Sequence, residues 1–209
     1  MDWEATWKKL HHWVNWNLEV IVVGTIKKSL AFAQELIRGV LLPGEHAIDA
    51  TAGNGHDTVF LSSLVGRKGL VWAFDIQEKA LLNTAKRLER KGLRQRVRLI
   101  QQGHERMATY VPGPVGAIMF NLGYLPGGDH TIVTQPDTTI AALESGLKLL
   151  RPGGIITLVI YTGHPGGKVE GVRLEKFSST ISPRSYHVLS YRFLNQQNHP
   201  PYLLAIEKR

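Results

Sequence analysis

Asn121, Leu122, Tyr124 and Asp129 follow one another closely and carry groups that can hold an amine or a planar base. The apolar run 115–120 before them is typical of a buried strand, so Asn121 should stand at its carboxyl end. Ligands bind at this edge of open α/β sheets. A side-chain carbonyl, a backbone carbonyl and an aromatic ring together suit a planar, nitrogen-bearing substrate.

A second candidate site lies upstream, where the sequence D-A-T-A-G-N-G-H-D-T occupies 49–58. Gly53 and Gly55 would let the backbone turn tightly before a helix, whose first N–H groups are free to bind a ligand. Thr58 stands where a dinucleotide-binding loop would have its third glycine. Asp49 would repel a pyrophosphate but could accept hydrogen bonds from an ammonium group or from loop N–H groups. A cationic or zwitterionic cofactor is therefore favoured over an ordinary strand-to-helix turn.

Asp75 follows the next apolar run, 69–74, about 20 residues after Gly53 and Gly55, whose segment we call the glycine loop. An acid at this position is placed to bind the two hydroxyls of a ribose, and Ile76 or Gln77 could flank an adenine ring. The alternative is that Asp75 caps the helix predicted over 78–90. A third strand, 97–101, ends at Gln102-Gly103-His104, and His104 could contact either cofactor or substrate. Polar groups at three strand ends indicate a nucleoside pocket.

These motifs, together with N-L-G-Y-L-P-G-G-D at 121–129, resemble the class I S-adenosylmethionine-dependent methyltransferases. More narrowly, they resemble a bacterial family first labelled ribosomal-RNA methylases, whose members are assigned as tRNA wobble-uridine 5-aminomethyl-2-thiouridine methyltransferases. The resemblance covers about 26–209 and is supported by the segments 150–154, 159–164 and 198–202. Thr162 and Ala52 depart from the family's common Pro and Cys, and neither change removes an obvious chemical group.

The resemblance implies a Rossmann-like α/β fold with a mostly parallel seven-stranded sheet, helices on both faces and an antiparallel C-terminal strand. It also implies S-adenosylmethionine as cofactor, S-adenosylhomocysteine as product, and no metal. The residues expected to bind the cofactor are Asp49, Thr51, Gly53, Asn54, Gly55, Asp57, Thr58, Asp75, Ile76, Gln77, Gly103, His104 and Asn121.

Methyl transfer to an amine requires a free lone pair, and an alkylammonium with a pKa of about 10 must first lose a proton. Asn121 and the Leu122 carbonyl could accept the amine N–H bonds, and Tyr124 could stack on the base or pack in the core. The predicted catalytic residues are Asn121, Tyr124, Asp129 and His164, and the predicted substrate-binding residues are Leu122, Tyr124, Tyr161 and His164. Asp129, His130, Tyr161, His164 and water remain alternatives as the proton acceptor.

The 209 residues are enough for one well-packed domain, expected over 25–209. The absence of cysteine excludes disulfides and thiolate chemistry. The net charge of +8 suits a polyanionic partner, and the resemblance makes this the anticodon region of tRNA. There is no apolar run of about 18 residues and no signal-peptide pattern, so we expect no membrane partner and a cytoplasmic location.

Residues 1–24 differ from the rest, because they hold four of the five tryptophans. Trp3, Trp7, Leu10 and Val14 fall near helical spacing, which predicts an amphipathic helix. It could pack on the domain or on a second subunit in a homodimer. Contact with RNA, a membrane surface and disorder are the alternatives.

From Ile26 onward, apolar strands alternate with helical patterns, as in a doubly wound parallel sheet. Strands are predicted near 46–50, 69–75, 96–101, 115–121, 155–161, 185–195 and 202–207, with the last two antiparallel to each other. Helices are predicted from Thr25 or Ser29 to the Pro43-Gly44 pair, over 57–64, 78–90 and 135–150, and near 168–181.

Seven basic residues lie near the end of the helix predicted over 78–90 and just beyond it: Lys86, Arg87, Arg90, Lys91, Arg94, Arg96 and Arg98. The end of that helix should lie at the edge of the sheet opposite Asn121. A solvated face is therefore the first interpretation, and contact with a distal part of a long RNA is the second.

The favoured function is methyl transfer from S-adenosylmethionine to nitrogen on a modified RNA base, which the resemblance narrows to the aminomethyl group of the wobble uridine. The same fold acting on ribosomal RNA or on a small molecule is the first alternative. A nicotinamide-dependent oxidoreductase is disfavoured by Thr58 and Asp49. A cofactor-binding RNA module without activity is disfavoured by the intact segment 121–126.

Overall fold

The computed structural model describes residues 25–129 and 131–209. The amphipathic helix predicted within 1–24 and the candidate His130 lie outside the described residues, so the division of the chain at residue 25 stays a prediction. Within the described ranges, no helix is both long and apolar enough to cross a membrane.

The centre of the fold is a seven-stranded sheet with the strand order β3-β2-β1-β4-β5-β7-β6. Its strands are β1 (Ala47–Asp49), β2 (Val71–Phe74), β3 (Val97–Ile100), β4 (Val115–Asn121), β5 (Leu150–Ile160), β6 (Tyr186–Tyr191) and β7 (Tyr202–Lys208). The first five strands are parallel, and β7 runs antiparallel between β5 and β6. The predicted mostly parallel sheet with an antiparallel C-terminal strand is confirmed.

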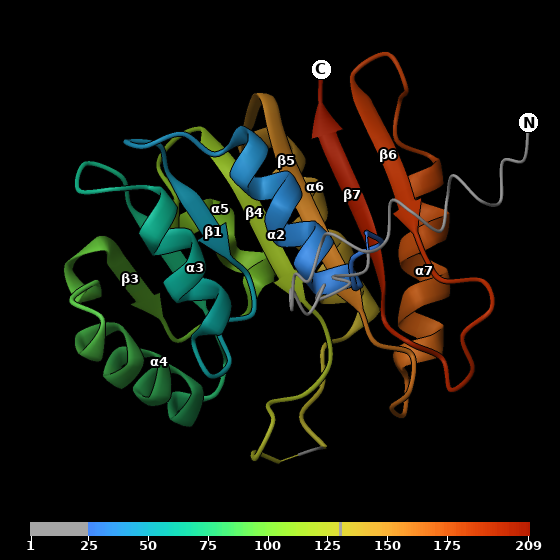
Figure 1. Cartoon of the computed structure of the whole chain (residues 1–209), viewed down its shortest axis with the longest axis horizontal. Helices are drawn as coiled ribbons and strands as arrows, with labels where there is room; N and C mark the ends of the chain where they lie inside the picture. Colours follow the sequence, from blue (N-terminus) through green and yellow to red (C-terminus); the bar gives the residue numbers. More distant parts are fainter. Residues whose placement is uncertain (1–24, 130) are drawn as a thin grey trace, which may run out of the picture.

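Helices cover both faces of the sheet, as Figure 1 shows. They are α2 (Ser29–Val40), α3 (His56–Leu64), α4 (Glu78–Arg90), α5 (Met107–Tyr110), α6 (Pro136–Leu149) and α7 (Gly167–Ser179), with short 3-10 helices η1 (Arg94–Arg96) and η2 (His104–Arg106). Buried residues of α2, α3 and α4 belong to one apolar cluster, and those of α5, α6 and α7 belong to another. The sheet therefore separates two cores.

The apolar strands explain this layering. In β4, Ala117 and Met119 pack into the α2–α3–α4 cluster, whereas Ile118 and Phe120 pack into the opposite one. Successive side chains of a strand point to opposite faces, so a strand buried on both sides must be apolar throughout. The first polar residue of β4 is Asn121, where the strand leaves the covered part of the sheet.

The fifth strand begins earlier than predicted. We expected Leu150 to end a helix and a strand to start at Ile155. Instead, Leu150 already pairs with Val115, and regular pairing resumes where Ile155 meets Ala117. The glycine-containing turn between them is an irregularity inside β5, because it places more residues on β5 than on β4.

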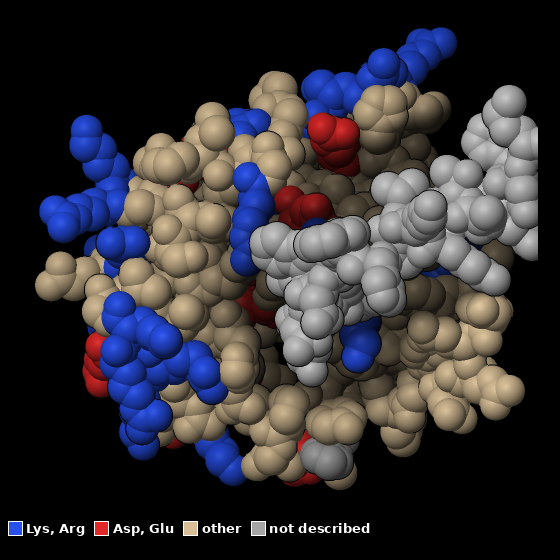
Figure 2. Space-filling model, viewed as in Figure 1, with Lys and Arg blue, Asp and Glu red and all other residues tan. Residues whose placement is uncertain are grey.

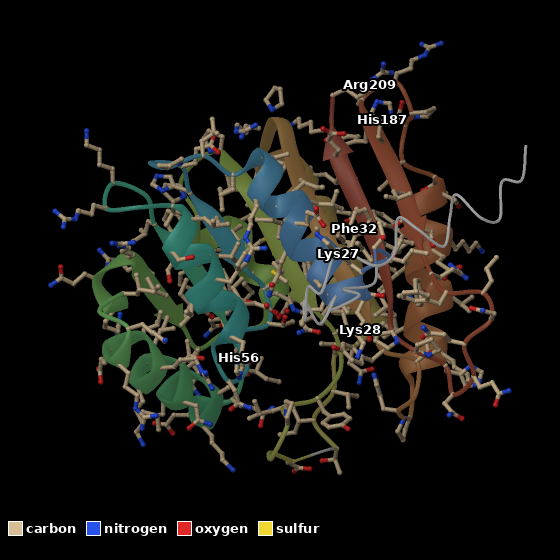
Figure 3. All side chains as sticks on the ribbon, in the orientation of Figure 1. Lys27, Lys28, Phe32, His56, His187 and Arg209 are labelled. Carbon is tan, nitrogen blue, oxygen red and sulfur yellow. The ribbon has the colours of Figure 1, made fainter. Side chains whose placement is uncertain are left out.

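The carboxyl ends of β1 to β5 meet at one edge of the sheet, which is the lower edge in Figure 1. Figure 3 shows His56, the first residue of α3, at this edge, while His187 and Arg209 lie at the opposite one. The segments that follow β1, β2, β3 and β4 are consequently neighbours, as the sequence predicted.

Candidate active site

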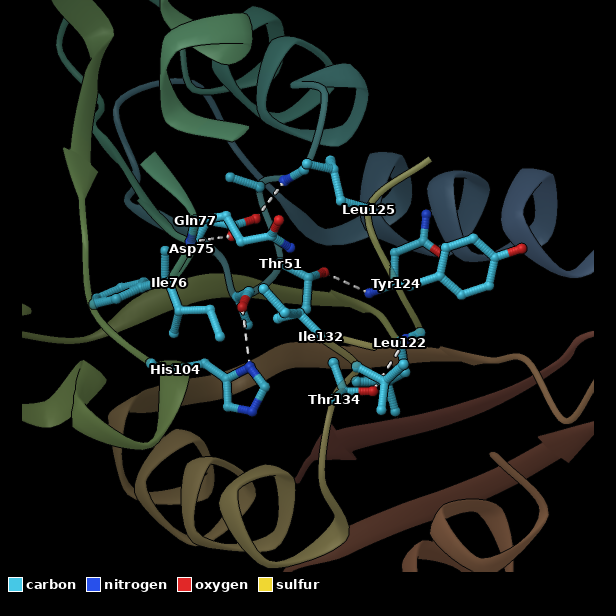
Figure 4. A pocket seen from close by; sticks show the side chains of 18 of the residues that line it. Thr51, Asp75, Ile76, Gln77, His104, Leu122, Tyr124, Leu125, Ile132 and Thr134 are labelled. Carbon is cyan, nitrogen blue, oxygen red and sulfur yellow. Dashed lines mark hydrogen bonds between the residues drawn. The ribbon is translucent and has the colours of Figure 1, made fainter. Parts of the chain in front are cut away.

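A cavity of about 570 Å³ opens at the carboxyl edge of the sheet. Five strand ends and the segment after β4 supply its walls, and Figure 4 shows the view into it. The lining residues are Ala50, Thr51, Ala52, Gly53, Asn54, His56, Asp57, Phe74, Asp75, Ile76, Gln77, Gln102, Gly103, His104, Glu105, Asn121, Leu122, Gly123, Tyr124, Leu125, Pro126, Ile132, Val133, Thr134, Gln135, Thr138, Tyr161 and His164.

Most of the predicted site residues are therefore brought together. Four of them, Asp49, Gly55, Thr58 and Asp129, lie outside the lining. Several lining residues were missed, such as Ile132 and Thr134, because their sequence neighbourhood gives no chemical signal and only the return of the chain toward β4 places them here.

Asp49 lies beneath the glycine loop rather than in the cavity, and its side chain is fully buried. Its carboxylate accepts hydrogen bonds from the Thr51 backbone N–H (3.1 Å) and the Thr58 hydroxyl (2.5 Å). Burial, aided by the charge of Asp57, raises the pKa of Asp49 to about 7. Asp49 thus holds the turn between β1 and α3 in place, which is the loop N–H role foreseen as one of its two alternatives.

The loop itself requires glycine at residue 55. Gly55 has a φ of 79°, and a Cβ there would lie 2.9 Å from the Thr84 Cα. This backbone conformation is accessible to glycine but strained for other residues. The close approach lets α4 pack against the start of α3.

Asp75 joins the glycine loop to the end of β2 (Figure 4). One carboxylate oxygen accepts from the Gly53 N–H and the other from the Gln77 N–H, both at 2.9 Å. Burial raises the pKa of Asp75 against the effect of these bonds. The helix that follows has Gln77 at its N-cap position, so Asp75 lies one turn before the helix and lines the cavity.

The His104 ring stands at the wall of the cavity, and its Nε2 atom is buried (Figure 4). It is 8% exposed, and its Nδ1 lies 3.1 Å from the Ala50 carbonyl oxygen. A carbonyl only accepts, so Nδ1 carries the proton and Nε2 has a free lone pair. Nε2 has no hydrogen-bond partner among the described residues. Burial lowers the pKa of His104, which keeps the ring neutral.

Asn121 is held by two hydrogen bonds. Its backbone N–H donates to the Thr51 hydroxyl at 2.7 Å, and its side-chain Nδ2 donates to Asp57 Oδ2 at 3.1 Å. An ionised carboxylate cannot donate, so it must face the NH2 end of the amide. The Asn121 side-chain carbonyl is therefore the end available to accept a hydrogen bond from a ligand.

The segment after β4 folds back over the cavity, and we call residues 122–135 the 122–135 loop. Tyr124 and Val133 form an antiparallel bridge, and Gly123 and Thr134 exchange two hydrogen bonds of 3.0 Å. The Thr134 hydroxyl also donates to Glu170 Oε2 at 2.7 Å. The loop is thereby fastened to α7, a connection that the sequence did not indicate.

The 122–135 loop also contacts the glycine loop. Asn54 Nδ2 donates to the Pro126 carbonyl at 3.1 Å and its Oδ1 accepts from Asn83 of α4. Lys79, near the start of α4, donates to the Gly127 carbonyl at 2.9 Å. The glycine loop and α4 on one side of the cavity are thus hydrogen-bonded to the 122–135 loop on the other side.

The aromatic and histidine candidates are neighbours. Tyr124 is 41% exposed, and its ring lies edge-on to that of His164 with centroids 6.0 Å apart.

Burial, aided by the Asp57 charge, raises the pKa of Tyr161. Tyr161 therefore stays protonated near neutral pH and is a poor proton acceptor. Asp129 accepts from the backbone N–H and hydroxyl of Thr131, which ties it into a local turn.

Three carboxylates surround the glycine loop, and burial is the main cause that raises the pKa of each: Asp49, Asp57 and Asp75. A cationic ligand nearby would favour their ionised forms and would itself be stabilised. The site consequently suits a positively charged cofactor better than a pyrophosphate. Among the described residues, no group of three His, Asp or Glu side chains is placed to hold a metal ion.

Comparison with known proteins gives consistent results. The model of the family described as "Putative rRNA methylase" matches residues 71–207. The chain is 38% identical over 192 residues to an Arabidopsis thaliana protein named tRNA (mnm(5)s(2)U34)-methyltransferase, chloroplastic. That alignment covers 86% of this chain and 70% of the relative.

Two solved structures are similar along almost their whole length. A "putative rRNA-methylase" from Clostridium thermocellum has a TM-score of 0.88 and 48% identity, with coverage of 89% of this chain and 100% of the other. A "putative methyltransferase" from Streptococcus mutans, in complex with S-adenosylhomocysteine, has a TM-score of 0.81 and 39% identity, with coverage of 88% and 99%.

Proposed function

From the premise that this chain belongs to the family described as "Putative rRNA methylase" and is an S-adenosylmethionine-dependent methyltransferase, we propose that it methylates the wobble uridine of tRNA. The acceptor is the 5-aminomethyl group of 2-thiouridine, and the product is 5-methylaminomethyl-2-thiouridine. The name of the Arabidopsis relative supports this choice of substrate. The observation that carries it is the Asn121 amide, whose carbonyl end is left to accept from an amine.

The cofactor would lie along the edge formed by the ends of β1, β2 and β3. Asp75 is proposed to bind the ribose hydroxyls, while Ile76 and Gln77 flank the adenine and the neutral ring of His104 lies against the cofactor. The glycine loop would contact the methionine part of the cofactor, with Asp49 acting from below. When bound, S-adenosylmethionine supplies an electrophilic methyl on a sulfonium.

The chain's own residues would orient the amine. Asn121 Oδ1 and the Leu122 carbonyl are proposed to accept its N–H bonds, which would direct the remaining lone pair toward the methyl. Tyr124 would stack on the base, since its ring is partly exposed at the cavity. Positioning and exclusion of water are the main contributions expected of these residues.

The proton of the substrate ammonium must leave before transfer. His164 lines the cavity beside Tyr124, whereas Tyr161 stays protonated and Asp129 is held in its turn outside the lining. The Nδ1 of His164 lies 2.9 Å from the Pro165 carbonyl oxygen and its Nε2 is buried, so we propose that water carries the proton away. Asp129 would then shape the 122–135 loop instead of acting in the chemistry.

The RNA would approach across the rim that α4 shares with the 122–135 loop. Figure 2 shows Lys and Arg side chains gathered over the part of the surface where Figure 1 places α4. Arg87 of the basic run lies closer to the site than expected, since it donates a 2.7 Å hydrogen bond to the Asn54 carbonyl of the glycine loop. Exposed Lys86 and Arg90 on the same helix would neutralise phosphates of the anticodon stem.

The experiment combines the protein with S-adenosylmethionine and tRNA from cells that lack the endogenous wobble methylation. The tRNA is then digested to nucleosides, and their masses are measured by mass spectrometry. A gain of one methyl on 5-aminomethyl-2-thiouridine is expected, and its absence would refute the proposed substrate. Ribosomal RNA serves as the second substrate in the same assay, because the family description names it.

We also propose a cytoplasmic location. A homodimer is proposed as the arrangement to test by sedimentation, with the full chain. Both proposals are independent of the chemistry at Asn121.

A further inference from the structure

A chain of hydrogen bonds reaches Asn121 from outside the cavity. Gln34, in the middle of α2, donates from Nε2 to Asp57 Oδ1 at 3.1 Å. The other carboxylate oxygen of Asp57 accepts from Asn121 Nδ2, also at 3.1 Å. The three side chains come from α2, α3 and the end of β4, so the contact connects three elements that are separate in the sequence.

Asp57 has little contact with solvent, because its side chain is 5% exposed. Burial raises its pKa, while the hydrogen bonds from Gln34 and Asn121 act in the opposite direction. The nearby His56 also favours the ionised form, and Asp57 in turn raises the pKa values of Asp49 and Tyr161. The two amide donors, together with His56, therefore favour the ionised form of this buried carboxyl group against the effect of burial.

The orientation of the Asn121 amide depends on this carboxylate. The two ends of an amide side chain have nearly the same shape, so packing alone does not distinguish oxygen from nitrogen. A protonated Asp57 can donate to the Asn121 oxygen, and the amide would then present its NH2 group to the substrate. Two N–H donors would then face each other, and the amine would no longer be held.

We propose that Gln34 and Asp57 are positioning residues that fix which end of the Asn121 amide faces the methyl acceptor. Gln34 contacts no reacting atom and acts only through Asp57. The catalytic consequence rests on the proposed role of Asn121 as the amine acceptor. Ala33 and Ile37 on the same helix are buried in the core, so α2 packs against the sheet and also supplies this donor.

The titration of Asp57 in the free protein tests the chain of contacts directly, by carbon-detected NMR of labelled aspartate carboxyl groups. Gln34→Met keeps the size of the side chain but removes the donor, so the Asp57 midpoint should move to higher pH. Gln34→Lys places a cation at the same position and should move it to lower pH. Glu35→Gln, a neighbour on α2 that pairs with Lys27, is the matched control and should leave it unchanged.

The same variants are then assayed for methyl transfer to tRNA as a function of pH. For Gln34→Met we expect kcat to fall about tenfold near pH 6. The acid limb of the kcat–pH profile, where activity falls as pH is lowered, should move to higher pH. The affinity for S-adenosylhomocysteine should stay unchanged. A purely structural Gln34 would lower thermal stability without moving the limb. Gln34→Lys should restore activity at low pH, because its cation keeps Asp57 ionised.

Identical Asp57 midpoints in the wild type, Gln34→Met and Gln34→Lys would overturn the inference, whatever the substrate is. Shifted midpoints with an unmoved acid limb would overturn the catalytic role of the contact. If the wild type methylates no tRNA while the midpoints shift as expected, the proposed substrate is wrong and the positioning of Asn121 by Asp57 stands.

Discussion

The hydroxyl of Thr134 donates a 2.7 Å hydrogen bond to Glu170, whose side chain is 2% exposed in α7. The other oxygen of this carboxylate accepts from the Thr139 hydroxyl of α6 at 2.9 Å. A buried carboxyl group therefore fastens the 122–135 loop to two helices on the far side of the sheet from the glycine loop. The position of Tyr124 over the cavity depends on that connection.

Thr134→Val should weaken this connection without changing the shape of the side chain. The Gly123 N–H and the Glu170 carboxylate each lose a partner, which should lower the free energy of unfolding by about 1–3 kcal/mol. The KM for tRNA should rise, while the Kd for S-adenosylhomocysteine stays unchanged because the glycine loop is untouched. Chemical unfolding and steady-state kinetics measure the two effects. Thr180→Val, at the exposed end of α7, is the control, and equal behaviour of the two variants would contradict the role of Thr134.

Asn121→Ala should abolish methyl transfer, with a loss of at least about 100-fold in kcat. It removes the side chain proposed to orient the amine, and it leaves the loops after β2 and β3 in place. The Kd for S-adenosylhomocysteine, measured by calorimetry, should change by less than about threefold. Asn195→Ala, on the exposed turn after β6, controls for the substitution. Turnover retained by Asn121→Ala would refute its role.

Asp49→Asn should make the protein more stable at neutral and alkaline pH. The folded-state pKa of Asp49 is raised to about 7, above the unfolded value of about 3.9. The unfolded chain therefore ionises first, and the wild type loses stability as pH rises from about 4 to about 7. The variant lacks this loss, so its advantage should grow by roughly 2–3 kcal/mol between pH 5 and pH 8.

Thermal unfolding of the Asp49→Asn variant at pH 5 and at pH 8 measures this difference. The Thr58 hydroxyl can rotate to accept from the new amide, so the loop should keep its shape. If the stability difference between the variant and the wild type is the same at both pH values, the folded-state pKa of Asp49 is not raised by burial.

His104→Phe should weaken the binding of S-adenosylhomocysteine by about tenfold, because it removes the hydrogen bond that holds the Ala50 carbonyl at the wall of the cavity. Phenylalanine keeps the ring in contact with Phe120 but removes the donor at Nδ1. Because burial lowers the pKa of His104, wild-type affinity should stay constant through neutral pH and fall only in more acidic solution. Calorimetry against the control His187→Phe, at the opposite edge of the sheet, tests this. Unchanged affinity would exclude His104 as a cofactor ligand.

Lys86→Glu combined with Arg90→Glu should raise the KM for tRNA by more than about tenfold and reduce the salt dependence of binding, because phosphate contacts release counterions. Lys148→Glu with Lys176→Glu changes the net charge equally at exposed positions of α6 and α7. If both pairs weaken tRNA binding equally, only the overall charge matters and α4 is not the contact surface. The Kd for the cofactor should not change in either pair.

The sequence predicted the parts of the site that stand at strand ends. Asp75, His104 and Asn121 follow apolar runs, and parallel strands bring such residues to one edge whatever the details of packing. Gln34 and Glu170 could not be predicted, because a single amide or carboxylate on a helix has no local signal. Their importance comes from partners 23 and 36 residues away.

The boundary of β5 was missed for a related reason. Glycine and proline at 151–154 indicate the end of a helix, but the pairing of Leu150 with Val115 is decided by the neighbouring strand. For Asp49 the sequence predicted a strand-end acid with two alternative partners, an ammonium group or loop N–H groups, but not the enclosing hydroxyl of Thr58.

The position of β7 has a consequence for how the protein folds. This strand follows β6 in the chain but lies between β5 and β6 in the sheet, with Tyr202 to Ile206 buried. During synthesis, β6 leaves the ribosome before the strand that must connect it to the sheet, so it has no partner until β7 is made. The sheet can therefore be completed only late, through contacts distant in the sequence, which are slow to form. Truncation before Tyr202 should leave the edge of β5 exposed and the protein prone to aggregate.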